Sequence, residues 1–243
     1  MFHFFILYFC IYYINCEFNL YEIYPKKIVN LQTIKIIHKT INSPNKTLCV
    51  FGVLNNNMGK IIEEEMLKWL IPNYNVYIVY QKYPGKLYEY PALKFAQYLI
   101  NKINQTLLLY VHSKGAFYPK RGNIQKVIRL LWKYEFSGEN KKKYIFPILN
   151  NQTDVTTMFT GSLKTTWFNG FYVSQRAFNI IRNLDRKLKK RKKRHKYETM
   201  FRGTKVRVLG ILKNNVNKKV HFYARKYYKK IYSNNKINKI IDL

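Results

Sequence analysis

The sequence predicts one α/β domain in which a mainly parallel sheet is covered by helices on both faces. Three short apolar runs, at residues 48–53, 76–80 and 107–112, have the length and character of fully buried strands. A segment with helical spacing of apolar residues follows each run. Such alternation with short links is typical of parallel sheets, in which ligands bind beyond the carboxyl ends of the strands.

The first strand, within residues 47–54, leads into an asparagine loop at 55–57. Apolar residues at helical spacing then predict a helix over residues 59–70. Its glutamates at 63–65 are expected in the early part of the helix, where the helix dipole favours carboxylates. Pro72 and Asn73 are expected to stop this helix before the second strand.

The alternation continues through the second half of the chain. Pro91 opens a predicted helix over 91–103, because a proline at the first helical position loses no hydrogen bond. The third strand ends in the turn Ser113-Lys114-Gly115. The remaining predicted elements are a helix over 124–136, strands over 155–159 and 167–173, and a helix over 177–184.

The composition suits one folded domain behind a short leader. Of 243 residues, 47% are apolar and 17% aromatic, which supplies a core and excludes global disorder. The formal net charge of +32 favours an anionic partner, although an AT-rich coding sequence would also enrich lysine and asparagine. We expect a leader at 1–16, a lead-in segment at 17–46, the folded domain at 47–212 and a basic C-terminal extension at 213–243.

The leader hypothesis depends on the apolar run at residues 2–14, which carries no charge apart from His3. The run is short for a membrane span and typical of a signal peptide, so we expect the secretory pathway, meaning the ER or Golgi lumen or secretion. Two alternatives stay open. Residues 2–15 could be an uncleaved signal-anchor that tethers the chain to a membrane, or a strand or helix of the domain itself.

Five segments near predicted strand ends and helix starts carry polar residues among aromatics. They are YEYPALK at 88–94, YVHSKGA at 110–116, WKYEF at 132–136, FTGSLKTTWFNGF at 159–171 and YETMF at 197–201. Together and in this order, over about residues 47–203, they resemble a family of glycosyltransferase-like proteins of protists, bacteria and large viruses. The resemblance implies a Rossmann-like fold of the GT-A type, a nucleotide-sugar donor and transfer to a hydroxyl of a glycan or protein acceptor.

Such a transfer needs positive charge at the leaving diphosphate. No D-x-D motif and no cysteine–histidine cluster with zinc spacing occurs in the chain, so we expect neither a divalent metal nor another cofactor. Lys114, with His112, is the candidate to neutralise the phosphates directly. In the alternative interpretation Lys114 is a surface charge and His112 caps the strand by hydrogen bonding.

An inverting transfer also needs a base for the acceptor hydroxyl, and Glu198 is the candidate because the resemblance implies an acid at that place. The alternative for Glu198 is a salt bridge to a neighbouring basic residue. Trp167, Asn169 and Gly170 are candidates for an acceptor platform, with a core role as the alternative for the tryptophan. Glu89 is expected to bind a ribose or base edge, or to cap the helix that follows.

Asp154 precedes a predicted strand, where a turn or helix-capping role is the alternative to a catalytic one. We expect His112, Lys114, Asn169 and Glu198 to converge on one cleft at the carboxyl ends of the strands.

Two other functions stay open. The chain could be a catalytically inactive binding module of the same fold, or it could bind nucleic acid or another polyanion through residues 186–196 and 223–230. A leader would carry the chain away from nuclear or cytosolic nucleic acid, so a nucleic-acid partner is not expected. The basic block at 186–196 is expected to be exposed and outside the catalytic centre, since the chain lacks the carboxylates to pair it in a buried place.

Overall fold

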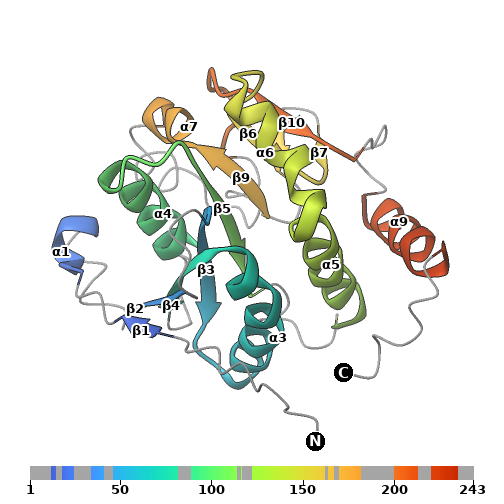
Figure 1. The fold of residues 1–243 in the computed structure, drawn as a ribbon, viewed down its shortest axis with the longest axis horizontal. Coiled ribbons are helices and arrows are strands. Elements are labelled where there is room, and N and C mark those ends of the chain that lie inside the picture. The colour runs from blue at the N-terminus through green and yellow to red at the C-terminus, as the bar shows by residue number, and fades with distance from the viewer. Residues whose placement is uncertain are drawn as a thin grey trace, which may run out of the picture.

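The protein has a mixed α/β fold in which one sheet lies between two groups of helices (Figure 1). A computed structural model describes residues 12–14, 18–24, 34–40, 46–81, 89–113, 116, 122–161, 164–166, 170–181, 200–212 and 220–234. In this part of the chain, no helix is long and apolar enough to cross a membrane.

The described strands form an eight-stranded sheet in the order β1-β2-β4-β3-β5-β9-β6-β10. Their bounds are Tyr12–Ile14 (β1), Lys35–Thr40 (β2), Asn75–Gln81 (β4), Leu48–Leu54 (β3), Leu107–His112 (β5), Phe171–Ser174 (β9), Val155–Thr157 (β6) and Val208–Gly210 (β10). A small hairpin is formed by β7 (Thr160–Gly161) and β8 (Thr165–Thr166).

The predicted parallel core is present, but the sheet as a whole is only partly parallel. Strand β3 pairs in parallel with both β4 and β5, and β6 pairs in parallel with β10. Strands β2 and β9 run the opposite way, so the expectation of a mainly parallel sheet is corrected at these two positions. The described residues of the link from β6 to β9 form the β7–β8 hairpin and include no crossover helix. Neighbouring strands joined without a crossover pair antiparallel.

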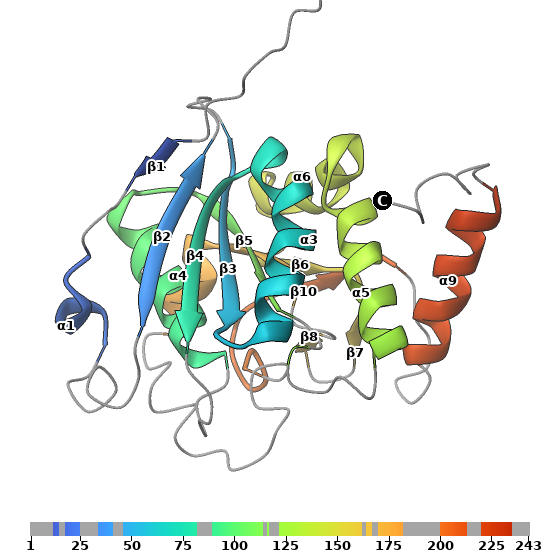
Figure 2. The same cartoon turned by 90° about the horizontal axis from the view of Figure 1, so that it is seen from below.

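Helices cover both faces of the sheet, as predicted. Figure 2 shows α3 and α5 in front of the strands and α4 behind them. The first face carries α3 (Asn57–Asn73), α5 (Gly122–Glu135) and α6 (Lys142–Leu149). A short 3-10 turn at Gly138–Lys141 leads into α6, and α9 (Val220–Asn234) packs against α5. The second face carries α1 (Leu20–Ile23), α4 (Tyr90–Lys102) and α7 (Gln175–Ile180).

Helix α3 differs from its prediction at both ends. Asn56 caps it, because the Asn56 side chain accepts a hydrogen bond from the Gly59 amide at 2.6 Å. Of the two predicted stop residues, Pro72 lies inside the helix and Asn73 is its last residue, so the helix extends beyond its predicted end at Leu70. Because the helix begins at Asn57, the glutamates at 63–65 lie beyond its first turn. The helix dipole therefore stabilises their carboxylates only weakly.

The glutamates of α3 instead join the helix to its neighbours. The Tyr80 hydroxyl on β4 donates to Glu63 at 2.5 Å. The Arg129 guanidinium on α5 donates to both oxygens of Glu65, at 2.9 to 3.3 Å. Such a two-pronged contact fixes the angle between α3 and α5 on the same face of the sheet.

The lead-in segment contributes structure that the sequence did not predict. Strand β2 pairs with β4 over Lys35–Lys39, and β1, which lies within the proposed leader, pairs with β2. The lysines and the histidine of β2 conceal its strand character in the sequence. The secretory location stays a prediction.

His38 on β2 gives the fold a pH-dependent contact. Its ring stacks on Tyr77 of β4, with 4.2 Å between ring centroids and 8° between planes. Its Nε2 is buried and accepts or donates no hydrogen bond within the described residues, and burial lowers the pKa of His38. The folded protein therefore holds this imidazole neutral at a pH where the unfolded chain protonates it.

We expect the free energy of unfolding to decline as the pH falls below about 6.5, because only the unfolded chain then gains a proton at His38. The decline ends below the lowered pKa of the folded state. In His38→Phe, which keeps a ring on Tyr77, the slope should be shallower by up to about 1.4 kcal/mol per pH unit. Urea unfolding of both proteins between acid and neutral pH measures this, and parallel slopes would contradict it.

Candidate functional site

The candidate site lies at the carboxyl ends of β3 and β5, where the order of the parallel strands reverses. From β3 the chain goes to β4 on one side and then to β5 on the other. In open α/β sheets this reversal leaves a crevice in which ligands bind. In Figure 2 the arrowheads of β3 and β4 point to the lower edge of the sheet, which is this edge.

The loops after β3 and β5 are held together by hydrogen bonds. The Leu54 amide donates to the Ser113 hydroxyl at 2.9 Å, and the Ser113 amide donates to the Gly52 carbonyl at 2.8 Å. The Asn56 side chain donates to the Ala116 carbonyl at 3.2 Å. These contacts fix the ends of the two strands next to each other, so side chains placed there are positioned by the sheet.

A carboxylate and an imidazole meet at this edge. Glu89 Oε1 lies 3.4 Å from His112 Nε2, and the Tyr110 hydroxyl lies 3.5 Å from Glu89 Oε2. The rings of Tyr110 and His112 stack, with 6.3 Å between centroids and 22° between planes. The side chains of Glu89 and His112 are 16% and 11% exposed, so water screens their interaction only partly.

The position of Glu89 distinguishes its two predicted roles. It is the residue before α4, yet its side chain makes no capping hydrogen bond to the helix. It faces His112 on β5 instead. The carboxylate therefore holds the imidazole in a fixed orientation.

Trp132 and Gly170 form the wall behind His112. The Trp132 ring meets the His112 ring edge to face, with 5.6 Å between centroids. A Cβ on Gly170 would lie 2.3 Å from Trp132 Nε1, so only glycine fits against this ring. Thr157 holds the Gly170 carbonyl through a 2.9 Å hydrogen bond.

The structure thus brings together three of the predicted site residues, Glu89, His112 and Gly170. The predicted residues Lys114, Trp167, Asn169 and Glu198 lie outside the described residues, as does the basic block at 186–196. The convergence of His112, Lys114, Asn169 and Glu198 stays a prediction.

Tyr110 and Trp132, which contact His112, were not predicted as site residues. Both are fully buried, and in the sequence they belong to an apolar strand and to the apolar face of a helix. The sequence signal that could have identified Tyr110 and Trp132 lies in the YVH and WKYEF segments, because each places an aromatic ring close to a polar residue.

Asp154 lies elsewhere and has a structural role. It is 1% exposed and precedes β6, at the opposite edge of the sheet. Its carboxylate accepts from the Arg207 amide at 2.7 Å and pairs with the guanidinium groups of Arg207 and Arg176 at 3.3 and 3.6 Å. This agrees with the turn interpretation, since the contacts fix the chain before β10.

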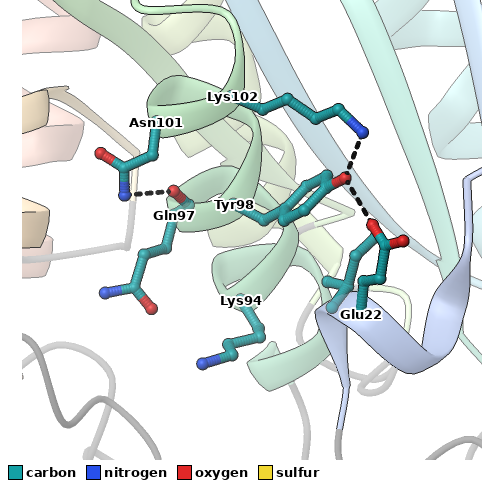
Figure 3. Close-up of a pocket in the computed structure, with 7 residues that line it drawn as sticks. Glu22, Lys94, Gln97, Tyr98, Asn101 and Lys102 are labelled. Carbon is teal, nitrogen blue, oxygen red and sulfur yellow. Dashed lines mark hydrogen bonds between the residues drawn. The ribbon is translucent and has the colours of Figure 1, made fainter.

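A shallow groove of about 590 Å³ lies between α1 and α4, away from the candidate site (Figure 3). In it the Tyr98 hydroxyl donates to Glu22 at 3.3 Å and accepts from Lys102 at 2.7 Å. The polar groups thus pair with one another, and no ligand is assigned to this groove.

Across the described ranges, no three acidic, histidine or cysteine side chains gather as metal ligands. The predicted lack of a metal stays a prediction. Comparisons with protein-family models, with curated proteins and with solved structures find no match to this chain.

Proposed function

We propose that the protein binds a nucleotide-sugar at the β3–β5 edge and transfers the sugar to a hydroxyl of a glycan or protein acceptor. The observation that carries the proposal is the meeting of Glu89, His112 and Gly170 at the carboxyl ends of the parallel strands. These three residues come from separate segments, each of which carries part of the glycosyltransferase-like resemblance.

The sheet supports the Rossmann-like, GT-A type of fold at the coarse level. Strands β4, β3 and β5 are parallel and are connected through α3 and α4 on opposite faces of the sheet. In open α/β sheets with this connectivity, ligands bind outside the carboxyl ends of the strands, which is where the candidate site lies.

The site residues have distinct parts in the proposed reaction. Glu89 is an acceptor of hydrogen bonds from ribose hydroxyls or a base edge, and it keeps the His112 imidazole in place. Lys114, two residues after His112, neutralises the diphosphate without a metal. Gly170 packs against the Trp132 ring in the wall behind His112. Asn169 and Trp167 hold the acceptor.

The chemical step exchanges one bond at the anomeric carbon for another. The bond from that carbon to the diphosphate oxygen breaks, and a bond to the acceptor oxygen forms. The acceptor proton passes to Glu198, and the diphosphate leaves with the electron pair. In the proposed secretory location, the acceptor is a lumenal or secreted glycan or protein.

We expect the full chain to be stabilised against heat by one member of a panel of nucleotide-sugars, through mass action on the folded state. Glu89→Gln should weaken that binding tenfold or more, on the order of one lost hydrogen bond to a charged group. Glu139→Gln, at an 84% exposed carboxylate, is the matched control and should bind as the parent does. Titration calorimetry measures both affinities.

Turnover separates the proposal from its alternatives. Glu198→Gln should bind donor and lose transfer, because its carboxylate acts in the transition state. Donor binding by the parent without any transfer would identify an inactive module. A panel in which no nucleotide-sugar binds, or equal losses in Glu89→Gln and Glu139→Gln, would refute the proposal.

A further inference from the structure

Helix α9 presents a basic face at the periphery of the molecule. Figures 1 and 2 show it outside α5, at the edge of the fold. Arg225, Lys226, Lys229 and Lys230 are exposed, and α9 contains no acidic residue. Within the described part of the chain none of these four cations forms an ion pair.

The opposite side of α9 is anchored to the domain. Ala224 and Ile231 are buried, at 0% and 8% exposure. The Tyr227 hydroxyl donates to the buried carboxylate of Glu135 on α5 at 2.7 Å. These contacts fix the rotation of α9 about its axis, so the basic face is held outward.

An aromatic side chain lies within the basic face. At 100° per residue, Phe222 falls in the same arc as the four cations and opposite Ala224 and Ile231. The Phe222 side chain is 61% exposed. The outer face of α9 therefore combines a row of cations with one large apolar group.

We infer that the outer face of α9 docks on the surface of a bilayer that contains anionic phospholipids. Lysine and arginine side chains reach headgroup phosphates, while a ring between them enters the interface below. A nucleic acid would match the cations, but Phe222 would need an unstacked base. The inference goes beyond the proposed function and does not depend on donor binding.

The apolar side of α9 is already occupied by α5, so the helix does not sink into the bilayer. Binding by this face is therefore mainly electrostatic and should weaken as salt is added. Each cation near an anionic surface strengthens binding roughly fivefold, and four together a few hundredfold.

The test is co-sedimentation of the full chain with phosphatidylcholine vesicles that contain or lack phosphatidylserine. The variant replaces Arg225, Lys226, Lys229 and Lys230 by glutamine. The matched control replaces four other exposed lysines by glutamine: Lys35, Lys60, Lys68 and Lys205. Heat denaturation shows that both variants fold.

We expect the α9 variant to lose at least a hundredfold of its affinity for the anionic vesicles, on the scale of four surface cations. The control, which removes the same charge, should lose less than a tenth as much. Phe222→Ser should remove the part of the binding that survives high salt.

Three results would overturn the inference: no preference of the parent for anionic vesicles, equal losses in the α9 variant and the control, or α9-dependent binding of an oligonucleotide with vesicle binding unchanged.

Discussion

Glu135→Ala is expected to lower the free energy of unfolding by about 3–6 kcal/mol, since it removes two hydrogen bonds to a buried carboxylate at about 1.5–3 kcal/mol each. Glu135 is fully buried at the end of α5. Its oxygens accept from the hydroxyls of Tyr144 on α6 and Tyr227 on α9, each at 2.7 Å. Lys143 pairs with the same carboxylate. The substitution therefore removes the hydrogen bonds that join α5 to α6 and to α9.

The tyrosines cannot compensate for the loss. Burial raises the pKa of both Tyr144 and Tyr227, so each remains a protonated donor. Tyr144 is fully buried and its hydroxyl would be left without an acceptor, whereas Lys143 is 35% exposed and can turn to water.

Urea unfolding measures the effect, with Glu139→Ala as the matched control four residues further on. Glu139 is 84% exposed and forms its ion pair with Lys142 at the surface, so its loss should cost no more than about 0.5 kcal/mol. Equal midpoints for the two variants would show that the buried network contributes nothing.

Gly170→Ala should cost about 1–3 kcal/mol of stability and weaken donor binding as well. The added Cβ would lie 2.3 Å from Nε1 and 2.4 Å from Cε2 of Trp132, whose side chain is fully buried and has no space to retreat. Because Trp132 contacts His112, a shifted indole displaces the imidazole from Glu89.

A double-mutant cycle with Trp132→Phe isolates this contact. Phenylalanine lacks the indole N–H edge that the new methyl group would strike, so Gly170→Ala should cost less in the Trp132→Phe background. We expect a favourable coupling of about 0.5–3 kcal/mol between the two substitutions. Simple additivity of the two stability losses would mean that the glycine is not required by the ring.

The core of the sheet could be predicted from the sequence because its signals are local. The runs at 48–53, 76–80 and 107–112 are apolar except for His112 at the end of the third, and the structure has them as β3, β4 and β5. Strand β2 was missed because its lysines and histidine interrupt the pattern, and only pairing with β4 makes it a strand.

The antiparallel direction of β9 was also not predicted from the sequence. Strand polarity is set by which neighbours a segment pairs with, and the residues of β9 do not encode that it lies between β5 and β6.

The sequence alone indicates that polar residues follow apolar runs of strand length, and that Glu89, His112 and Gly170 belong to segments in which polar residues or glycine lie among aromatics. The tertiary structure is needed to show that these three residues lie around Tyr110 and Trp132. It also shows that Glu135 and Asp154 form hydrogen bonds that stabilise the fold. The physical reason is that a side chain's type is encoded locally, whereas its partners, burial and charge environment depend on segments that the fold brings together.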